Sequence, residues 1–385
     1  MAAPAFAAPQ VTPVTVEQVS QFLITSGHEK DAKLARQLST LQLTERADQE
    51  TLAKWRAKIS GKQTRRALTE LADASAFLPL PKSASLANSP PAPVEMQDII
   101  DRAIRYVNHA VPRLPDFYAL RTTTHFEDAP ALQQDVRNAC KGAAYQSLCL
   151  ANAGANTPPI ISEFNPLHFE GATTATVTYR DGQEVTSQHF ENAFAPRQQQ
   201  YGLVTTGEFG PILVVVLGDA LHGKVFWDSW QQSPAGPLAV FRYVVSKEKS
   251  HFMVSCPSVS GAQEVIPAYH GEFAIAPSTG TVYRITMISD LEPPLQDQEA
   301  SIAVEYESVP IGGASYICPV RGVAFSRVPV FSSRLGKIVK MPLMQTRLND
   351  VTFTRFHLFR AEMKILSEAG GRSLSTPAQP EAQAH

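Results

Sequence analysis

The chain has 385 residues, of which 44% are hydrophobic, and its formal net charge is -2. This length and composition suffice for a packed core in one large domain or in two. With a net charge this close to zero, there is no electrostatic basis for expecting the protein to bind nucleic acid or an anionic membrane surface. No apolar run approaches the roughly 20 residues of a membrane-spanning helix. We therefore expect a globular protein without a nucleic-acid partner or a transmembrane segment.

The first residues suggest the compartment. Residues 1–13 are rich in Ala and Pro, and the run from Ala5 to Ala8 resembles the small-residue end of a secretory signal peptide. The charged start of such a signal is missing, so residues 1–13 are interpreted as a signal remnant or a disordered segment. We predict an exported bacterial protein, periplasmic or extracellular, with a cytoplasmic home as the alternative.

The four cysteines form no CxxC pair, which argues against a metal site built on sulfur. Cys140 and Cys149 lie close together in a polar stretch. In an exported protein they are candidates for a local disulfide that contributes about 2–3 kcal/mol. Four reduced, mostly buried thiols are the alternative.

Residues 14–78 carry apolar side chains at helical spacing and predict a small bundle of short helices. Thr15 precedes the first helix and Gly27 follows it. The second helix is marked by Leu34, Leu38 and Leu41, the third by Leu52, Trp55 and Ile59 with Gly61 at its end, and the fourth by Ala67, Leu68, Leu71, Ala72 and Phe77. The basic residues Lys62, Arg65 and Arg66 are interpreted as a solvated helix face rather than a ligand site.

Residues 79–93 are rich in Pro, Ser and Ala and are predicted to be a linker. A helix with one apolar stripe is expected at residues 94–110. A second is expected at residues 207–221, with Pro211 near its start and Gly223 after its end. The run from Val214 to Val216 makes a strand the alternative there.

Residues 94–366 are predicted to form one curved antiparallel β domain, and residues 367–385 a disordered tail. The clearest hairpin joins residues 173–179 to 184–189 through Asp181-Gly182. The remaining predicted strands span residues 118–126, 225–231, 238–245, 251–256, 272–276, 281–290, 300–308, 315–320, 323–331 and 351–359. About ten strands favour an open barrel or half-barrel-like sheet covered on its concave side by the two helices. The fold class is thus α+β.

No common catalytic signature is present: H-E-x-x-H, G-x-S-x-G, the phosphate loop and G-x-G-x-x-G are all missing. The match of Ser246 and Lys249 to S-x-x-K falls in a predicted turn and is interpreted as chance. We therefore expect no enzymatic activity and no cofactor.

In three places a His and a carboxylate residue are two positions apart, so the two side chains of each pair lie on the same face of a strand. They are His168 with Glu170, His189 with Glu191, and His270 with Glu272. Such a pair could hold a metal ion or transfer a proton. Polar pairs that stabilise a solvated sheet face are the favoured interpretation, and no metal site is predicted.

Large apolar residues recur on neighbouring predicted strands. The candidates for lining an apolar binding cavity are Trp227, Phe241, Tyr243, Phe252, Ile285 and Met287. A sheet face this apolar needs a cover, so it forms either a ligand cavity or an ordinary packed core. Trp227 and Trp230, three residues apart on one strand, are expected on opposite faces.

Two resemblances bear on function. The segment from Tyr269 to Ile285, with residues 302–306 and 316–319, resembles the strand and turn layout of the outer-membrane lipoprotein carrier superfamily. That resemblance implies a curved half-barrel whose hydrophobic concave face holds acyl chains. Residues 114–117, 121–128, 207–211 and 240–243 are similar to a group of exported bacterial proteins of no known function.

These observations lead to one functional hypothesis and two alternatives. The leading hypothesis is an exported, non-enzymatic protein that binds a lipid or a lipidated partner in the concave face of its sheet. A structural or protein-interaction scaffold with a fully packed sheet is the first alternative, and a secreted hydrolase that uses the His–carboxylate pairs is the second.

Overall fold

The computed structural model describes residues 11–86, 88–128, 166–187, 208–258, 261–334 and 337–359. These residues contain six α-helices and one large antiparallel sheet of eleven strands that does not close on itself. The helices are α1 (Val16–Ser26), α2 (Asp31–Leu38), α3 (Gln49–Ala57), α4 (Lys62–Ala74), α5 (Pro93–Ala110) and α8 (Pro211–His222). The α+β class is confirmed.

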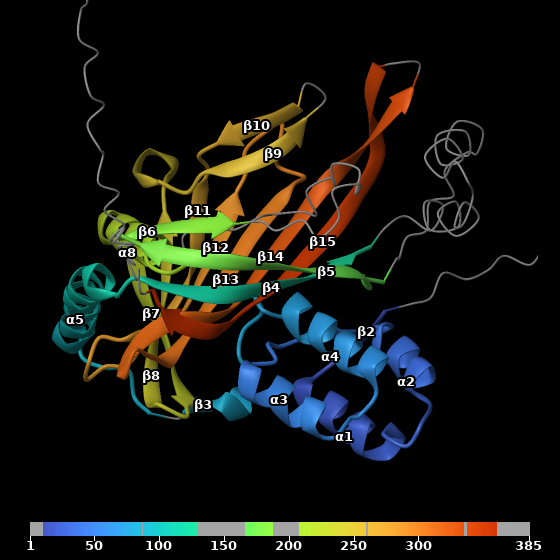
Figure 1. Cartoon of the computed structure of the whole chain (residues 1–385), viewed down its shortest axis with the longest axis horizontal. Helices are drawn as coiled ribbons and strands as arrows, with labels where there is room; N and C mark the ends of the chain where they lie inside the picture. Colours follow the sequence, from blue (N-terminus) through green and yellow to red (C-terminus); the bar gives the residue numbers. More distant parts are fainter. Residues whose placement is uncertain are drawn as a thin grey trace, which may run out of the picture.

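The large sheet has the strand order β3-β7-β8-β11-β12-β13-β14-β15-β4-β5-β6. Its strands are β3 (Ser85–Leu86), β4 (Phe117–Glu127), β5 (His168–Arg180), β6 (Gln183–Ser187), β7 (Lys224–Ser233), β8 (Gly236–Val245), β11 (Ala268–Ile275), β12 (Val282–Asp290), β13 (Glu299–Ile311), β14 (Ala314–Arg334) and β15 (Lys337–Leu358). From β11 to β15 the strands follow chain order, as a meander does. The sheet then continues through β4, so the two ends of the chain's β region lie side by side (Figure 1).

Residues 12–78 form what we call the N-terminal module. It consists of α1 to α4 and a short parallel pair, β1 (Thr12–Val14) with β2 (Leu41–Leu43), which the sequence analysis missed. Its helices bury Val19, Leu34, Leu52, Trp55 and Leu68 in one shared core. The side chain of Thr15 caps α1, as predicted.

Two details of this module correct the sequence analysis. Leu41 belongs to β2 and not to the second helix, because the chain leaves α2 at Leu38 and pairs with β1. Gly61 precedes α4 as its N-cap, while α3 already ends at Ala57.

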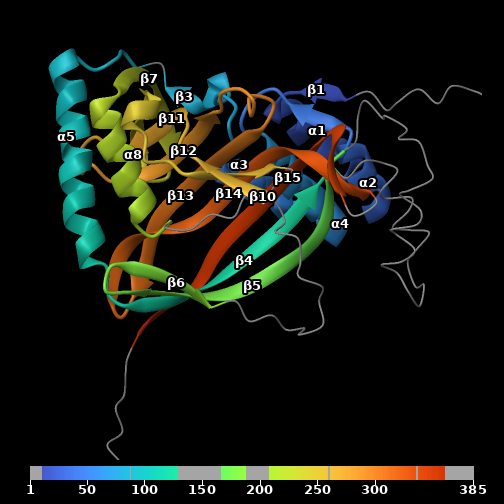
Figure 2. The same cartoon turned by 90° about the horizontal axis from the view of Figure 1, so that it is seen from above.

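The two faces of the large sheet carry different covers. Helices α5 and α8 lie together over one face (Figure 2), and their Ile99, Ala103, Val216 and Leu217 enter the apolar core there. The N-terminal module packs on the other face, where Ala76 contacts Ala303 and Val323. The amphipathic helices thus bury their apolar sides on a sheet whose residues alternate between the two faces.

Most predicted elements are present with shifted ends. Residues 211–222 are helical, so the alternative of a strand there is wrong. β14 and β15 are far longer than predicted, since each continues through residues that the pattern split or left out. The strand predicted at 251–256 begins only at Val254, as β9 (Val254–Ser258), and pairs with the unpredicted β10 (Gly261–Val265).

Two turns contain residues with positive φ angles, and the first of them is the predicted hairpin. Asp181 and Gly182 join β5 to β6 with positive φ angles of 51° and 76°, as a tight hairpin requires. Gly280, with φ of 76°, ends the turn before β12, and a Cβ there would lie 2.4 Å from the backbone of Arg102 in α5. The absence of a side chain at Gly280 therefore lets α5 approach the sheet closely.

Candidate functional site

The six predicted cavity residues come together in one apolar cluster under α5 and α8. Phe241 and Tyr243 lie on β8, Ile285 and Met287 on β12, and all four are at most 2% exposed. Phe252 precedes β9 and is 7% exposed, and Trp227 packs against the cluster from β7. Ring contacts join them: Phe241 lies 5.5 Å from Trp227 and 5.7 Å from Phe273 between ring centroids.

Trp227 and Trp230 lie on the same side of the sheet, contrary to prediction. The register of β7 against β8 shifts between Trp227 and Ser229, which makes Asp228 a bulged residue. The bulge resets the alternation of side chains. The two indole rings are therefore only 5.0 Å apart and both contact the apolar cluster.

A buried carboxylate lies at the edge of this cluster. Asp219 on α8 accepts a hydrogen bond from the hydroxyl of Tyr269 at 2.9 Å and one from the backbone N–H of His251 at 2.8 Å. The Nδ1 atom of His251 lies 2.6 Å from the same carboxylate, while the side chain of His251 is 75% exposed. Asp219 thus ties α8 to the loop before β9 and orients an exposed imidazole.

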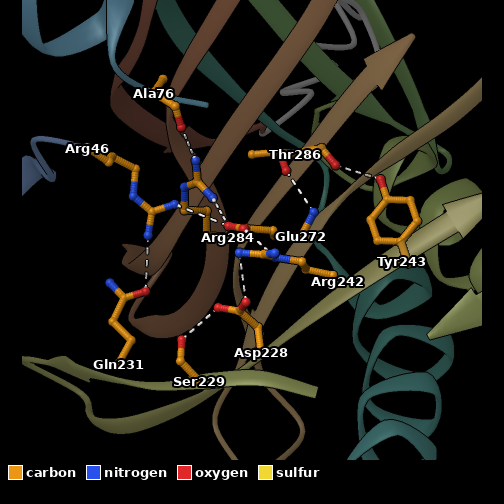
Figure 3. A network of polar contacts seen from close by, with 10 residues as sticks. All are labelled: Arg46, Ala76, Asp228, Ser229, Gln231, Arg242, Tyr243, Glu272, Arg284 and Thr286. Atoms are coloured by element: carbon orange, nitrogen blue, oxygen red, sulfur yellow. Dashed lines mark hydrogen bonds and ion pairs between the residues drawn. The ribbon is translucent and has the colours of Figure 1, made fainter. Parts of the chain in front are cut away.

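The opposite face holds a network that we call the charged interface, made of Arg46, Asp73, Asp228, Arg242, Glu272, Arg284, Glu305, Arg321 and Asp350. At one end of it, Arg46 reaches from the N-terminal module to Gln231 at 3.3 Å and to Glu272 at 3.6 Å (Figure 3). Arg284 donates to the carbonyl of Ala76 at 2.5 Å and also lies 3.6 Å from Glu272. Glu272 therefore faces an arginine from each side of the contact between the module and the sheet.

Arg321 forms the other end of the charged interface. Its guanidinium donates to Asp73 of α4 and, at 3.1 Å, to Asp350 of β15. Burial alone would lower the pKa of Arg321, but the two carboxylates raise it above its usual value. Burial raises the pKa of Asp73 well above its usual range, although Arg321 opposes that shift. Burial and the neighbouring Arg46 lower the pKa of Arg284.

A cavity of about 10 Å³ lies within the charged interface, lined by Arg46, Asp73, Arg284, Glu305 and Arg321 among others. This volume is near the minimum for a single water molecule. Asp73 Oδ2, Glu305 Oε2 and Arg46 Nε are buried there without a hydrogen-bond partner. One water could bridge such atoms, whereas an organic ligand needs several hundred Å³.

A second polar group lies where β15, β4 and β5 run side by side. His125 Nδ1 lies 2.8 Å from Asn349 Oδ1, and its Nε2 lies 3.1 Å from Thr173 Oγ1. Burial lowers the pKa of His125, so the ring is neutral near pH 7. Further along, Glu127 accepts a hydrogen bond from Gln345 at 3.0 Å. Phe126 and Phe169 point to the module side, so Glu127 points to the other face.

The His–carboxylate pairs do not share one cleft. His168 lies 2.7 Å from Glu170 on β5, while His270 on β11 pairs with Asp290 at 2.9 Å and not with Glu272. Five strands of the sheet separate β5 from β11. His189 lies outside the described residues. The hydrolase hypothesis required at least two of these histidines in one cleft, and the two described ones do not meet that requirement.

The remaining candidates from the sequence analysis are the basic residues of α4, the S-x-x-K match and the cysteines. Arg65 donates to the carbonyl of Ile59 at 2.6 Å, and Arg66 lies 3.6 Å from the ring centre of Phe169, so both contribute to packing. Ser246 and Lys249 lie in a loop that contains a single 3-10 turn. Cys318 is buried, and burial raises the pKa of its thiol to about 12. Cys140 and Cys149 lie outside the described residues, and their disulfide stays a prediction.

Comparisons with known proteins add no assignment, because no family model, no curated protein and no solved structure matches the chain. Among the described residues, no helix is long and apolar enough to cross a membrane.

Sequence reasoning missed Asp219 and the charged interface. Arg46 and Glu272 are 226 positions apart, so no local pattern links them. The available signal was weak: Arg242, Glu272 and Arg284 interrupt otherwise apolar strands at positions that alternate with core residues. Such charges predict a solvated face unless a second module is known to cover it.

Proposed function

We propose that this protein is a non-enzymatic, exported interaction scaffold, in which a packed sheet carries the N-terminal module and the module docks a partner protein. The proposal rests on the burial of the predicted cavity residues: Phe241, Tyr243, Ile285 and Met287 are at most 2% exposed beneath α5 and α8. Side chains at that burial act as core. The division of the chain at residues 79–93, a bundle-like module and a half-barrel-like sheet are part of this proposal.

The charged interface supports a scaffold with a fixed orientation. Ion pairs and hydrogen bonds are directional, so a buried network permits few arrangements of two surfaces, whereas apolar contact permits many. Arg46, Arg284 and Arg321 each join the N-terminal module to the sheet. We infer that they keep the module in one position on the sheet.

Carriage of an apolar ligand is the second candidate. It is favoured by one observation: all six predicted residues gather in one cluster, directly under two helices. In this version α5 and α8 act as lids that open for a lipid or an acyl chain, which would be stabilised by about 0.8 kcal/mol per buried methylene.

Enlarging a small buried residue separates the two candidates. Ala220 of α8 faces the apolar cluster and is 3% exposed. In a filled core, Ala220→Leu should destabilise the protein by about 1–3 kcal/mol through overpacking. Above a ligand cavity the same change should be neutral and should reduce the bound ligand. Val214→Leu, on the exposed side of α8, is the matched control and should change neither quantity.

Both quantities are measurable on the full chain. Urea unfolding gives the stability of each variant, and native mass spectrometry of protein from its own exported fraction detects a bound lipid or acylated peptide. A ligand at near-stoichiometric amount, together with a neutral Ala220→Leu variant, contradicts the scaffold. An apo mass that vesicle lipids do not change, with a destabilised variant, contradicts the carrier.

A further inference from the structure

The start of β5 and the end of β4 bring together one imidazole and two carboxylates that the proposed function does not use. Glu127, the last residue of β4, is the register partner of His168, the first residue of β5. One His168 ring nitrogen and one oxygen each from Glu127 and Glu170 all lie within 4.8 Å of one another. Among the described residues, this is the one such group of three metal-ligating side chains.

A β-bulge places the third member. His125 pairs with Gly171 and Phe126 with Phe169, so Glu170 is an extra residue in the register of β5 with β4. Bulges turn a side chain away from its regular direction and occur often beside functional sites. Here the bulged Glu170 keeps its carboxylate next to the imidazole of His168, two positions earlier on β5, with 2.7 Å between Oε1 and His168 Nε2.

The surroundings of His168 decide which nitrogen is available. Its Nδ1 atom lies 3.4 Å from the backbone carbonyl oxygen of Pro166. A carbonyl oxygen only accepts, so a hydrogen bond to it requires the proton on Nδ1, and in the neutral ring this leaves the lone pair on Nε2. An Nδ1–H bonded to a backbone carbonyl is the usual support for a histidine that binds a metal through Nε2.

The Nε2 atom faces the carboxylates without forming a hydrogen bond to them. Among the described residues it is buried and has no hydrogen-bond partner, although Glu170 Oε1 is 2.7 Å away. A lone pair so close to a carboxylate oxygen is repelled, and a cation that binds both atoms from the side offsets this repulsion.

Glu127 is held in place for the same role. It is 4% exposed, Gln345 donates to its Oε2 at 3.0 Å, and Arg347 Nε lies 3.9 Å from that oxygen. Contacts of this kind to one carboxylate oxygen orient the group and are typical of the residues that support metal ligands. They come from β15, so three strands contribute to the arrangement.

We propose that His168 Nε2 and one carboxylate oxygen each from Glu127 and Glu170 bind a divalent transition-metal ion, with Zn²⁺ as the best match. One nitrogen and two oxygens without sulfur suit Zn²⁺, and the imidazole disfavours Ca²⁺ and Mg²⁺. Three protein ligands leave a fourth tetrahedral position for water. The ion links the end of β4 to the start of β5, independently of what the N-terminal module binds.

The test measures Zn²⁺ binding to the full chain after chelator treatment and dialysis. Isothermal titration calorimetry should give one Zn²⁺ per chain, and metal analysis after dialysis should give the same ratio. Glu170→Gln keeps the size and hydrogen-bonding capacity of the side chain but removes the charge, and should weaken binding by about 100-fold. His168→Gln should weaken it at least as much, and Zn²⁺ should raise the melting temperature of the wild type but not of these two variants.

The chain offers a matched control. His270 and Asp290 form a His–carboxylate pair of similar length, at 2.9 Å, and no third metal-ligating side chain of the described residues joins them. His270→Gln should leave Zn²⁺ affinity unchanged. The proposal is wrong if the wild type binds no Zn²⁺, in which case the three residues form only a polar cluster. Equal Zn²⁺ affinity in the wild type and Glu170→Gln would also overturn it. So would a loss of Zn²⁺ affinity in His270→Gln as large as that in Glu170→Gln. The urea unfolding curve of Glu170→Gln shows whether that variant has lost Zn²⁺ binding or has lost its fold.

Discussion

The two faces of the large sheet are built from the same strands but hold their covers by different physics. On β8, Phe241 enters the apolar cluster under α5 and α8 while the next residue, Arg242, joins the charged interface. On β12, Ile285 and Arg284 divide in the same way. One face therefore depends on the area of apolar surface it removes from water, and the other combines a smaller apolar contact with particular pairs of charged atoms.

This difference teaches what each face can contribute. Apolar burial stabilises in proportion to area and tolerates small changes of arrangement. A buried ion network contributes little net stability, because desolvation offsets its Coulomb energy, yet it is strongly destabilised when one partner is lost. The helices α5 and α8 are thus the main source of cohesion, and the charged interface sets the position of the N-terminal module.

The largest effect should come from breaking the charged interface at Arg321. Arg321→Ala leaves Asp73 and Asp350 buried without their shared partner, and should lower the free energy of unfolding by about 3–5 kcal/mol. Urea denaturation followed by circular dichroism measures this. If the change costs no more than a surface substitution, the network is not buried in solution.

The double variant Asp73→Leu with Arg321→Leu is the control for that experiment. It removes the Asp73–Arg321 pair and should cost clearly less than the sum of the two single changes, since neither of the two is left as an unpaired charge. If the loss of unfolding free energy in the double variant equals the sum of the two single losses, the Asp73–Arg321 pair is not coupled. The two faces of the sheet would then not differ in the way described above.

A smaller effect is expected on the apolar side at Gly280. Gly280→Ala should cost about 2–3 kcal/mol, because the residue has a positive φ and its Cβ would meet the backbone of Arg102 in α5. Gly236 also has a positive φ but has open space at its Cβ position, so Gly236→Ala measures the conformational strain alone. Equal losses of melting temperature in the two variants would mean that α5 does not lie against this turn.

The smallest effect is a pH dependence on the module side, at Asp128. Burial raises the pKa of Asp128 from 3.8 to about 6. The folded chain therefore binds more protons than the unfolded chain between these values, and stability falls as pH rises through this range. Asp128→Asn, which can still accept from Thr346, should be more stable than the wild type by about 1–2 kcal/mol at pH 7, since partial exposure reduces the full effect.

Urea unfolding of both proteins at about pH 4 and about pH 7 checks this linkage. The difference between them should nearly vanish at the lower pH, where Asp128 carries a proton in the folded wild type. A constant difference across both pH values would show that the group is not perturbed by burial.

The sequence determined the local elements of this protein. Thr15 capping α1, the positive φ angles of Asp181-Gly182, and the apolar stripe of Ile99, Ala103 and Val107 are properties of neighbouring residues, so pattern and propensity predict them. The gathering of Phe241, Tyr243, Ile285 and Met287 on one face followed from strict alternation along two strands.

Only the tertiary structure decided those contacts that the regular alternation of side chains along a strand does not predict. The bulge at Asp228 moved Trp230 to the side of Trp227, and the bulge at Glu170 brought its carboxylate to His168 and Glu127, because both depend on the register with another strand. The pairing of Arg321 with Asp73 joins residues 248 positions apart. Burial turns such charges from surface groups into specific partners, and which of them are buried is set only when the N-terminal module packs on the sheet.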